Sequence, residues 1–219
     1  MHTFQPYPMN MLEFNPFQKI GSEWAAVTAE ADGKANAMTV SWGGVGVMWG
    51  KNVATIYIRD SRYTKELIDA SDTFSINFFE DDHMHSTLNY LGKVSGHNED
   101  KIAGARLHIN HMTGTPFLDE AKFVILCKKL SATRITADQF IDPTIADKWY
   151  ADGDMHTMYR RDHRCLSPLI YAHTQKPGCC LHPGFLCITV RLRSYPVIFL
   201  LFHAICQSYR RNPEWCRKS

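Results

Sequence analysis

The sequence predicts a mainly β protein, a barrel or a sandwich of short strands with a few short helices. Within the first 159 residues, short segments of alternating apolar and polar residues recur between turns. They do not alternate regularly with long helices, and no G-x-G-x-x-G motif follows a strand. These observations favour a barrel or a sandwich over a doubly wound sheet.

The first strands are expected to form a hairpin. Trp24–Glu30 and Ala35–Trp42 flank Asp32-Gly33, a dipeptide that favours the positive φ angles of a tight hairpin turn. The glycines of Gly43-Gly-Val-Gly46 then break the pattern. We expect a loop there, whose backbone can approach a ligand closely because glycine has no Cβ.

The next segments read as strands and short helices. Alternation over Asn52–Arg59 predicts a half-buried strand, and a helix is expected to start near Tyr63. The further expected elements are a strand over Thr73–Phe79, short helices over His85–Leu91 and Asp100–Ala105, one or two strands within Ala121–Thr136, and a last strand that begins at Met155 and is lost after Tyr159.

Arginine and hydroxyl side chains gather where the strand over residues 52–59 gives way to the next helix. They are Arg59, Ser61, Arg62 and Thr64. The free N–H groups of a helix start attract anions, and guanidinium and hydroxyl groups add hydrogen-bond donors. This corner is therefore a candidate phosphate site. Alternatively, the arginines are solvated charges and the hydroxyls form an ordinary helix cap.

The strand Asn36–Trp42 contains small and polar residues and ends in a tryptophan, so it is suited to lie along a flat aromatic ligand. A core or interface role for Trp42 is the alternative. A phosphate site one strand away from such a strand suggests a phosphorylated aromatic cofactor.

Four motifs in a fixed order resemble those of the FMN-binding split-barrel flavin reductases and flavoredoxins. The motifs are Asn36-Ala-Met-Thr-Val-Ser-Trp42, Arg59-Asp-Ser-Arg-Tyr-Thr-Lys-Glu66, Gly92-Lys-Val-Ser-Gly96 with Asp100-Lys101, and Gly153-Asp-Met-His-Thr157. The resemblance runs from about Pro16 to Tyr159. It implies an FMN-binding split β-barrel, Greek-key-like, whose C-terminal strands are replaced by an unrelated tail.

The same resemblance implies a set of residues that bind FMN. They are Asn36, Met38, Thr39, Val40, Ser41 and Trp42 along the isoalloxazine ring, and Arg59, Ser61, Arg62, Thr64, Ser95 and Lys101 around the phosphate. We also hypothesise that the charge of Lys101 lies near the pyrimidine edge of the ring and favours the anionic reduced flavin. The alternative is a solvated lysine beside Asp100.

The resemblance implies a catalytic role for His156, which matches the histidine of a Gly-Asp-His-Thr segment near the flavin. Met155 is inserted before it, and a structural strand histidine remains the alternative. The implied activity is an oxidoreductase that passes electrons from NADH or NADPH through FMN to free flavin or another acceptor. A flavoredoxin-like electron carrier, served by a redox protein partner, is the alternative, and the implied assembly is a homodimer.

The chain changes character after Tyr159. Of seven cysteines only Cys127 precedes this point, and residues 160–219 contain 10 basic against two acidic residues. The first 159 residues contain 14 basic against 20 acidic residues. We therefore divide the chain into a flavin reductase-like domain, 1–159, and an aberrant basic, cysteine-rich tail, 160–219.

A reading-frame error is our hypothesis for this tail. Arg160-Arg-Asp-His-Arg164 can be encoded CGG CGA GAT CAC CGG, and a shift of one base gives Gly-Glu-Ile-Thr, which resembles the strand that family members have here. The chain would then be a frameshifted, inactive product of an enzyme gene. Resequencing the DNA from the codon of Met158 to that of Cys165 tests this, and an intact frame shared by relatives would reject it.

The remaining signals exclude several classes of function. His173, Cys179, Cys180, His182 and Cys187 lack paired zinc-ligand spacing, so no metal site is expected. The apolar stretch 196–206 is far shorter than the ~20 residues that cross a bilayer. The first 159 residues carry no basic stripe, which argues against a nucleic-acid partner. Nothing at the start resembles a secretion signal, so we expect a cytoplasmic protein with reduced cysteines.

Overall fold

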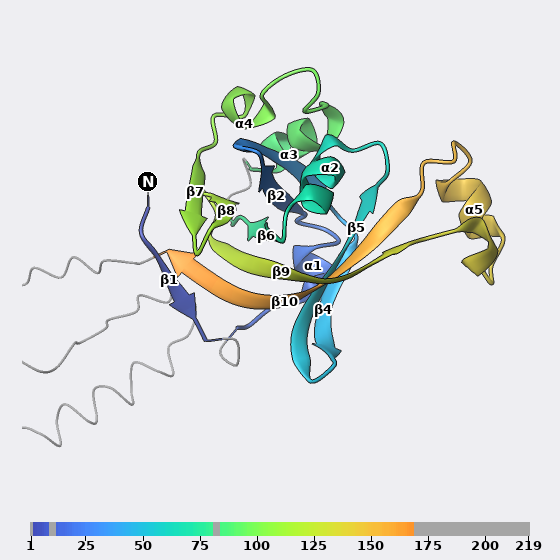
Figure 1. The fold of residues 1–219 in the computed structure, drawn as a ribbon, viewed down its shortest axis with the longest axis horizontal. Helices are drawn as coiled ribbons and strands as arrows, with labels where there is room; N and C mark the ends of the chain where they lie inside the picture. The colour runs from blue at the N-terminus through green and yellow to red at the C-terminus, as the bar shows by residue number, and fades with distance from the viewer. Residues whose placement is uncertain (1, 9–11, 81–83, 169–219) are drawn as a thin grey trace, which may run out of the picture. The chain divides into compact units, whose positions relative to one another are not determined.

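One large antiparallel sheet dominates the computed structural model, which describes residues 2–8, 12–80 and 84–168 (Figure 1). Its strands follow the spatial order β3-β2-β6-β9-β10-β5-β4, and β1 pairs with β10. They are β1 (Phe4–Tyr7), β2 (Ala25–Ala31), β3 (Lys34–Val40), β4 (Gly43–Met48), β5 (Lys51–Arg59), β6 (Thr73–Phe78), β9 (Phe123–Arg134) and β10 (His156–Pro168). The expected mainly β fold class is confirmed.

The sheet curls around one apolar core. Met38 and Val40 of β3 contribute to this core at one end of the sheet, and Val45 of β4 packs against it at the other. Because the two end strands share a core without pairing to each other, the described strands form a barrel that is split between β3 and β4. Helix α2 (Tyr63–Ala70) buries Leu67 and Ile68 in the same core.

A second apolar core covers the outer face of the sheet. It is formed by α3 (Met84–Lys93), α4 (Lys101–Gly104) and the hairpin of β7 (Ile109–Met112) and β8 (Thr115–Leu118), which bury Leu88, Leu91, Ile102 and Leu118 beside Ala26 and Ala37 of the sheet. Two short helices lie outside both cores: α1 (Pro16–Lys19) and α5 (Thr144–Trp149), which belongs to the link between β9 and β10. No described helix is long and apolar enough to span a membrane.

The hairpin predicted at Asp32-Gly33 is confirmed, with φ angles of 51° and 71° at its two turn residues. The loop predicted at Gly43-Gly-Val-Gly46 was wrong, because these residues form β4 and pair with β5 from Gly43↔Ile56 to Met48↔Lys51. Pairing with β5 and the packing of Val45 against the core override the low strand preference of glycine.

The end predicted for the last strand was also wrong. β10 continues past Tyr159 to Pro168 and pairs with β5, β9 and β1 along its length. Ladder hydrogen bonds come from the backbone, so a strand can continue through residues that carry no strand signal. The division at residue 159 and the reading-frame error stay hypotheses, and residues 169–219, with their candidate zinc ligands and apolar stretch, lie outside the described residues.

Candidate functional site

A cavity of about 210 Å³ lies between β3, the start of α2 and the loop that leads into α4. We call it the basic pocket. It is lined by Met38, Ser61, Arg62, Tyr63, Thr64, Val94, Ser95, Gly96 and Lys101. Six of the twelve residues predicted to bind the cofactor meet here, although they come from three separate segments of the chain. No acidic side chain is among its described lining residues.

Two cations define the charge of the basic pocket. Arg62 donates from Nη1 to the Gly92 carbonyl at 2.9 Å, and Lys101 donates from Nζ to the Leu91 carbonyl at 2.9 Å. Lys101 is only 3% exposed, and neither cation has a carboxylate partner among the described residues. Burial, together with the nearby charge of Arg62, lowers the pKa of Lys101 to about 8. An anion in the pocket would offset both effects.

The hydroxyls of the basic pocket differ in what they can offer a ligand. Oγ1 of buried Thr64 accepts a hydrogen bond from Nδ2 of Asn36 at 2.8 Å, and Ser95 accepts one from the His97 N–H at 3.3 Å. Each of these two hydroxyls therefore keeps its own proton to donate to an anion. Ser61 instead donates its N–H at 3.0 Å and its hydroxyl at 2.7 Å to the carboxylate of Asp154.

The backbone at the start of α2 adds to the positive character of the pocket. Arg62 is the N-cap residue, with an extended backbone, and no side chain caps the helix. Helix N-termini left without a capping side chain present N–H groups and the positive end of the helix dipole. Cations, hydroxyl donors and a helix start thus converge on one cavity, a combination that suits a phosphate group.

Strand β3 lies beside the basic pocket and is an end strand of the sheet. Among the described strands it pairs only with β2, so its other edge presents backbone N–H and C=O groups. Of its predicted site residues, only Met38 lines the pocket. Asn36 supports Thr64, Thr39 donates to the Leu88 carbonyl, and Val40 is buried in the core. A flat ligand on this edge would therefore meet mainly backbone.

The structure does not bring Arg59 to the basic pocket. Its guanidinium donates to the carbonyl of Asp154 at 2.9 Å and to that of Trp149 at 3.0 Å, and it lies 5.6 Å from the centre of the Tyr150 ring. A role for Arg59 in contacting the phosphate has no support in this arrangement. Arg59 instead anchors the segment that precedes β10.

His156 and Trp42 meet in an aromatic cluster, which we define as Trp42, Trp149, Tyr150 and His156. Trp42 lies with Ser41 in the half-buried link between β3 and β4, and its ring centre is 4.8 Å from that of His156 and 5.1 Å from that of Trp149. Nδ1 of His156 is 2.9 Å from the Tyr150 hydroxyl. The cluster therefore includes the end of the predicted ring-binding segment and the predicted catalytic residue.

His156 is held in its neutral form. Its side chain is buried, and burial, followed by the charge of Arg59, lowers its pKa to about 4. At neutral pH the ring can donate or accept a hydrogen bond, but it carries no second proton to give away. Any function of His156 near pH 7 must therefore use the neutral imidazole.

Three residues around these sites were not predicted from the sequence. Asp154, which binds Ser61, lies within the quoted Gly153–Thr157 motif and could have been found there. Trp149 and Tyr150 lie in a segment without a recognisable motif, so only the structure brings them to His156.

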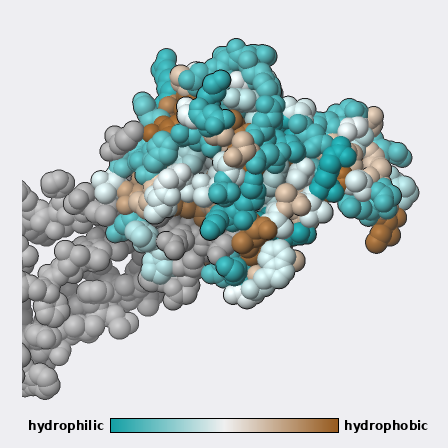
Figure 2. All heavy atoms as spheres, in the orientation of Figure 1, coloured by the Kyte–Doolittle hydropathy of each residue, from teal (hydrophilic) through white to brown (hydrophobic). Residues whose placement is uncertain are grey.

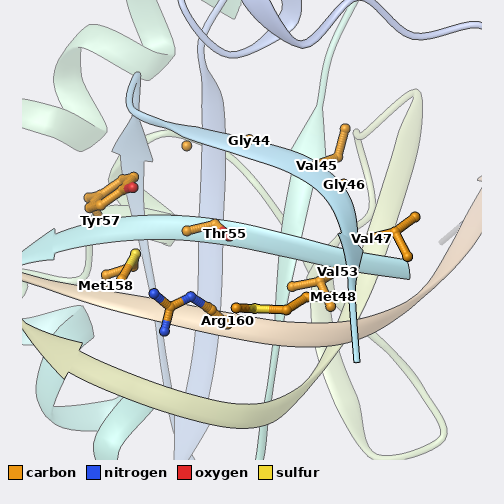
Figure 3. Close-up of a pocket in the computed structure, with 11 residues that line it drawn as sticks. Gly44, Val45, Gly46, Val47, Met48, Val53, Thr55, Tyr57, Met158 and Arg160 are labelled. Atoms are coloured by element: carbon orange, nitrogen blue, oxygen red, sulfur yellow. The ribbon is translucent and has the colours of Figure 1, made fainter. Parts of the chain in front are cut away.

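A second cavity, of about 350 Å³, lies on the outer face of the β4–β5 hairpin and β10 (Figure 3). Figure 3 shows Tyr57 from β5 beside Met158 from β10, with the small residues Gly44 and Thr55 near them. None of the predicted site residues lines this cavity. It is an open sheet face with a single cationic lining residue, Arg160, and we assign it no ligand.

The family model described as flavin reductase like domain matches residues 17–175. A comparison with curated proteins found no match. Similar solved structures include an FMN-binding domain of a flavin reductases-like enzyme from Shewanella baltica OS155, with 13% identity over 76% of this chain and 78% of that one, at a TM-score of 0.55.

Two flavoredoxins are also similar in structure. The protein from Desulfovibrio vulgaris (Miyazaki F) is 19% identical over 66% of this chain and 68% of its own, at a TM-score of 0.50. The protein from Methanosarcina acetivorans is 20% identical at a TM-score of 0.49, and the match covers 64% of each chain, less than two thirds of that relative. For the Shewanella and Desulfovibrio structures, the likeness at these identities shows a shared fold.

Proposed function

Because this chain belongs to the flavin reductase-like family, we propose that it is an oxidoreductase that binds FMN, with the FMN phosphate in the basic pocket. The observation that carries the proposal is the convergence of Arg62, Lys101 and the free hydroxyl protons of Thr64 and Ser95 on a cavity without acidic lining residues. A phosphate dianion is the group that this set of donors fits.

The size of the basic pocket suggests where the rest of FMN would lie. Its volume of about 210 Å³ is smaller than the roughly 300 Å³ at which pockets for whole drug-sized ligands begin. Only the phosphate end would therefore be enclosed, and the ring would lie along the free edge of β3, between Met38 and Trp42. Bound FMN would supply the electron-transfer chemistry, while the protein binds and orients it.

We further propose that electrons come from NADH or NADPH and pass to free flavin or another acceptor. The aromatic cluster supports this reading, because it places a neutral histidine at the end of the segment that would hold the ring. His156 would then act as a hydrogen-bonding group towards a bound ring.

FMN affinity is expected to be highest between about pH 6 and about pH 8. Below about pH 6 the phosphate loses its second negative charge. Lys101 has a pKa lowered to about 8, so above that pH it must gain a proton on binding, and affinity falls by up to about tenfold per pH unit. Fluorescence titrations from about pH 5 to about pH 10 measure this. Lys101→Arg should remove the fall above pH 8 because arginine stays charged.

The test of the proposed function starts with the purified chain. Its visible spectrum and the flavin released on denaturation identify the cofactor, and NADH or NADPH is then added without oxygen. Rapid bleaching of bound FMN supports the reductase. Bleaching only by a reduced protein partner indicates the flavoredoxin-like carrier, and a soluble chain that takes up no added FMN contradicts the proposal.

A homodimer stays a prediction for this chain. Val47 and Trp49 at the β4–β5 hairpin and Ile141 in the β9–β10 link are large apolar residues left mostly exposed. Figure 2 shows small groups of brown, hydrophobic spheres on a face that is otherwise largely hydrophilic. Burying them against a second copy would gain stability. The mass in solution from light scattering tests this, and a monomer at micromolar concentration would contradict it.

A further inference from the structure

Tyr150 is fixed beside His156 by the contacts of the segment that precedes β10. Arg59 holds this segment through the carbonyls of Trp149 and Asp154, and the Asp60 N–H donates to the Met155 carbonyl at 2.9 Å. These three backbone contacts fix the position of Tyr150, whose hydroxyl lies within hydrogen-bond distance of Nδ1 of His156.

The direction of this hydrogen bond follows from what each partner needs. Burial raises the pKa of Tyr150, so its hydroxyl keeps its proton at neutral pH. Among the described residues that hydroxyl has no other hydrogen-bond partner than Nδ1 of His156. A neutral imidazole carries a single N–H. If it were on Nδ1, the Tyr150 proton would lack a protein acceptor in the described residues, whereas a bond donated by Tyr150 satisfies both groups.

We propose that Tyr150 is a positioning residue that fixes His156 as the Nε2–H tautomer, so that Nε2–H is presented as a neutral hydrogen-bond donor. Nε2 has no partner within the described part of the chain. The ring that bears it lies against Trp42, at the end of the segment proposed to hold the flavin. The role of Nε2–H as a donor to a carbonyl oxygen of a bound flavin or nicotinamide ring rests on the proposed function. The assignment of the Nε2–H tautomer is independent of that function.

The groups around His156 are compatible with this assignment. Burial and the charges of Arg59 and Arg62 lower the pKa of His156. The carboxylates of Asp60 and Asp154 raise it, but their effect is smaller than that of burial. The ring is therefore neutral near pH 7, and the hydrogen bond at Nδ1 decides which of its two nitrogens carries the proton. The donor at Nε2 should consequently persist from about pH 5.5 to about pH 8, because the ordinary histidine pKa of about 6.5 no longer applies.

The test uses ¹⁵N-labelled, FMN-free protein. Long-range ¹H–¹⁵N spectra separate protonated from unprotonated ring nitrogens, and a His156→Gln sample assigns the signals among 11 histidines. We expect a protonated Nε2 and an unprotonated Nδ1 in the wild type. In Tyr150→Phe the pKa of His156 should rise from about 4, because a bond donated to the neutral ring opposes its protonation. A protonated Nδ1, or a pKa that falls or stays constant in the variant, would overturn the proposal.

Tyr57→Phe is the matched control. Tyr57 lies on β5 two residues before Arg59, the strand partner of His156, so it is on the same face of the sheet as His156. It lines the outer cavity of Figure 3, and its hydroxyl makes no hydrogen bond to His156. This variant should leave the tautomer and the pKa of His156 unchanged. A change equal to that of Tyr150→Phe would mean that any lost hydroxyl disturbs the ring, which contradicts a specific role for Tyr150.

Loaded enzyme supplies an independent readout of the role in the reaction. Tyr150→Phe should lower the rate of flavin reduction by NADH by about two- to tenfold, the size of one net hydrogen bond, while FMN affinity stays at the wild-type value. Wild-type protein that shows the Nε2–H tautomer but binds no FMN would overturn the proposed function and leave the tautomer standing. An unchanged reduction rate would contradict the donor role.

Discussion

Replacing both Arg62 and Lys101, as Arg62→Gln with Lys101→Met, is expected to weaken FMN binding by about 10²–10⁴-fold. Hydrogen bonds to charged groups contribute about 1.5–3 kcal/mol each, and the two cations supply two such contacts to a phosphate. Both replacements remove the charge and keep an unbranched stem, and Lys101→Met also suits a position that is 3% exposed. Titration of FMN fluorescence with each variant gives the loss.

Lys65→Gln is the control for this double variant. Lys65 lies in α2, three residues after Arg62, and is also a cation, but it pairs with Asp69 at 2.8 Å and does not line the basic pocket. It should leave FMN affinity within about twofold, since exposed ion pairs contribute little. Equal losses in the control and the double variant would show that overall charge, and not the basic pocket, attracts FMN.

Gly96→Ala is expected to disrupt the basic pocket by steric conflict. A Cβ at this position would lie 2.6 Å from the Tyr63 ring and 2.7 Å from Oδ1 of Asn36. Asn36 cannot give way, because it is buried and its amide holds Thr64. Overpacking of this kind costs about 1–3 kcal/mol, so we expect that loss in the free energy of unfolding. The loop with Ser95 should also move, which weakens FMN binding by about tenfold or more.

Gly46→Ala provides the matched comparison for that substitution. A Cβ on Gly46 meets no atom within 4 Å, and Gly46 lies in β4, away from the basic pocket. Denaturant unfolding and FMN titration should both give wild-type values within about 0.5 kcal/mol. If Gly96→Ala behaved in the same way, the contact of the Ser95 loop with Asn36 and Tyr63 would be irrelevant to the pocket.

The parts of the fold that the sequence predicts are those set by local chemistry. Asp32-Gly33 accepts positive φ angles, so the turn of the first hairpin could be placed at these two residues. The helix start at Tyr63 also follows from local signals, and it brought Arg62 and Thr64 to the predicted phosphate corner. In both cases the structure is determined by residues that are neighbours in the chain.

Other parts depend on contacts between distant residues, which no local pattern contains. Strand β4 exists because Gly43-Gly-Val-Gly46 pairs with β5, not because glycine favours strands. Arg59 donates a hydrogen bond to the carbonyl of Asp154, 95 positions away in the sequence. It therefore does not line the basic pocket, where the sequence predicted that it would contact the phosphate. Tyr150 reaches His156 only through the folding of the β9–β10 link. Tertiary contacts decided each of these outcomes.

Comparing FMN with riboflavin on the same purified chain tests whether the basic pocket holds the phosphate of FMN. The two ligands share the ring and the ribityl chain and differ only in the phosphate. We expect FMN to bind about 10²-fold or more tightly than riboflavin at pH 7, with the difference abolished in Arg62→Gln with Lys101→Met. Equal affinity for the two ligands in the wild type would contradict the claim.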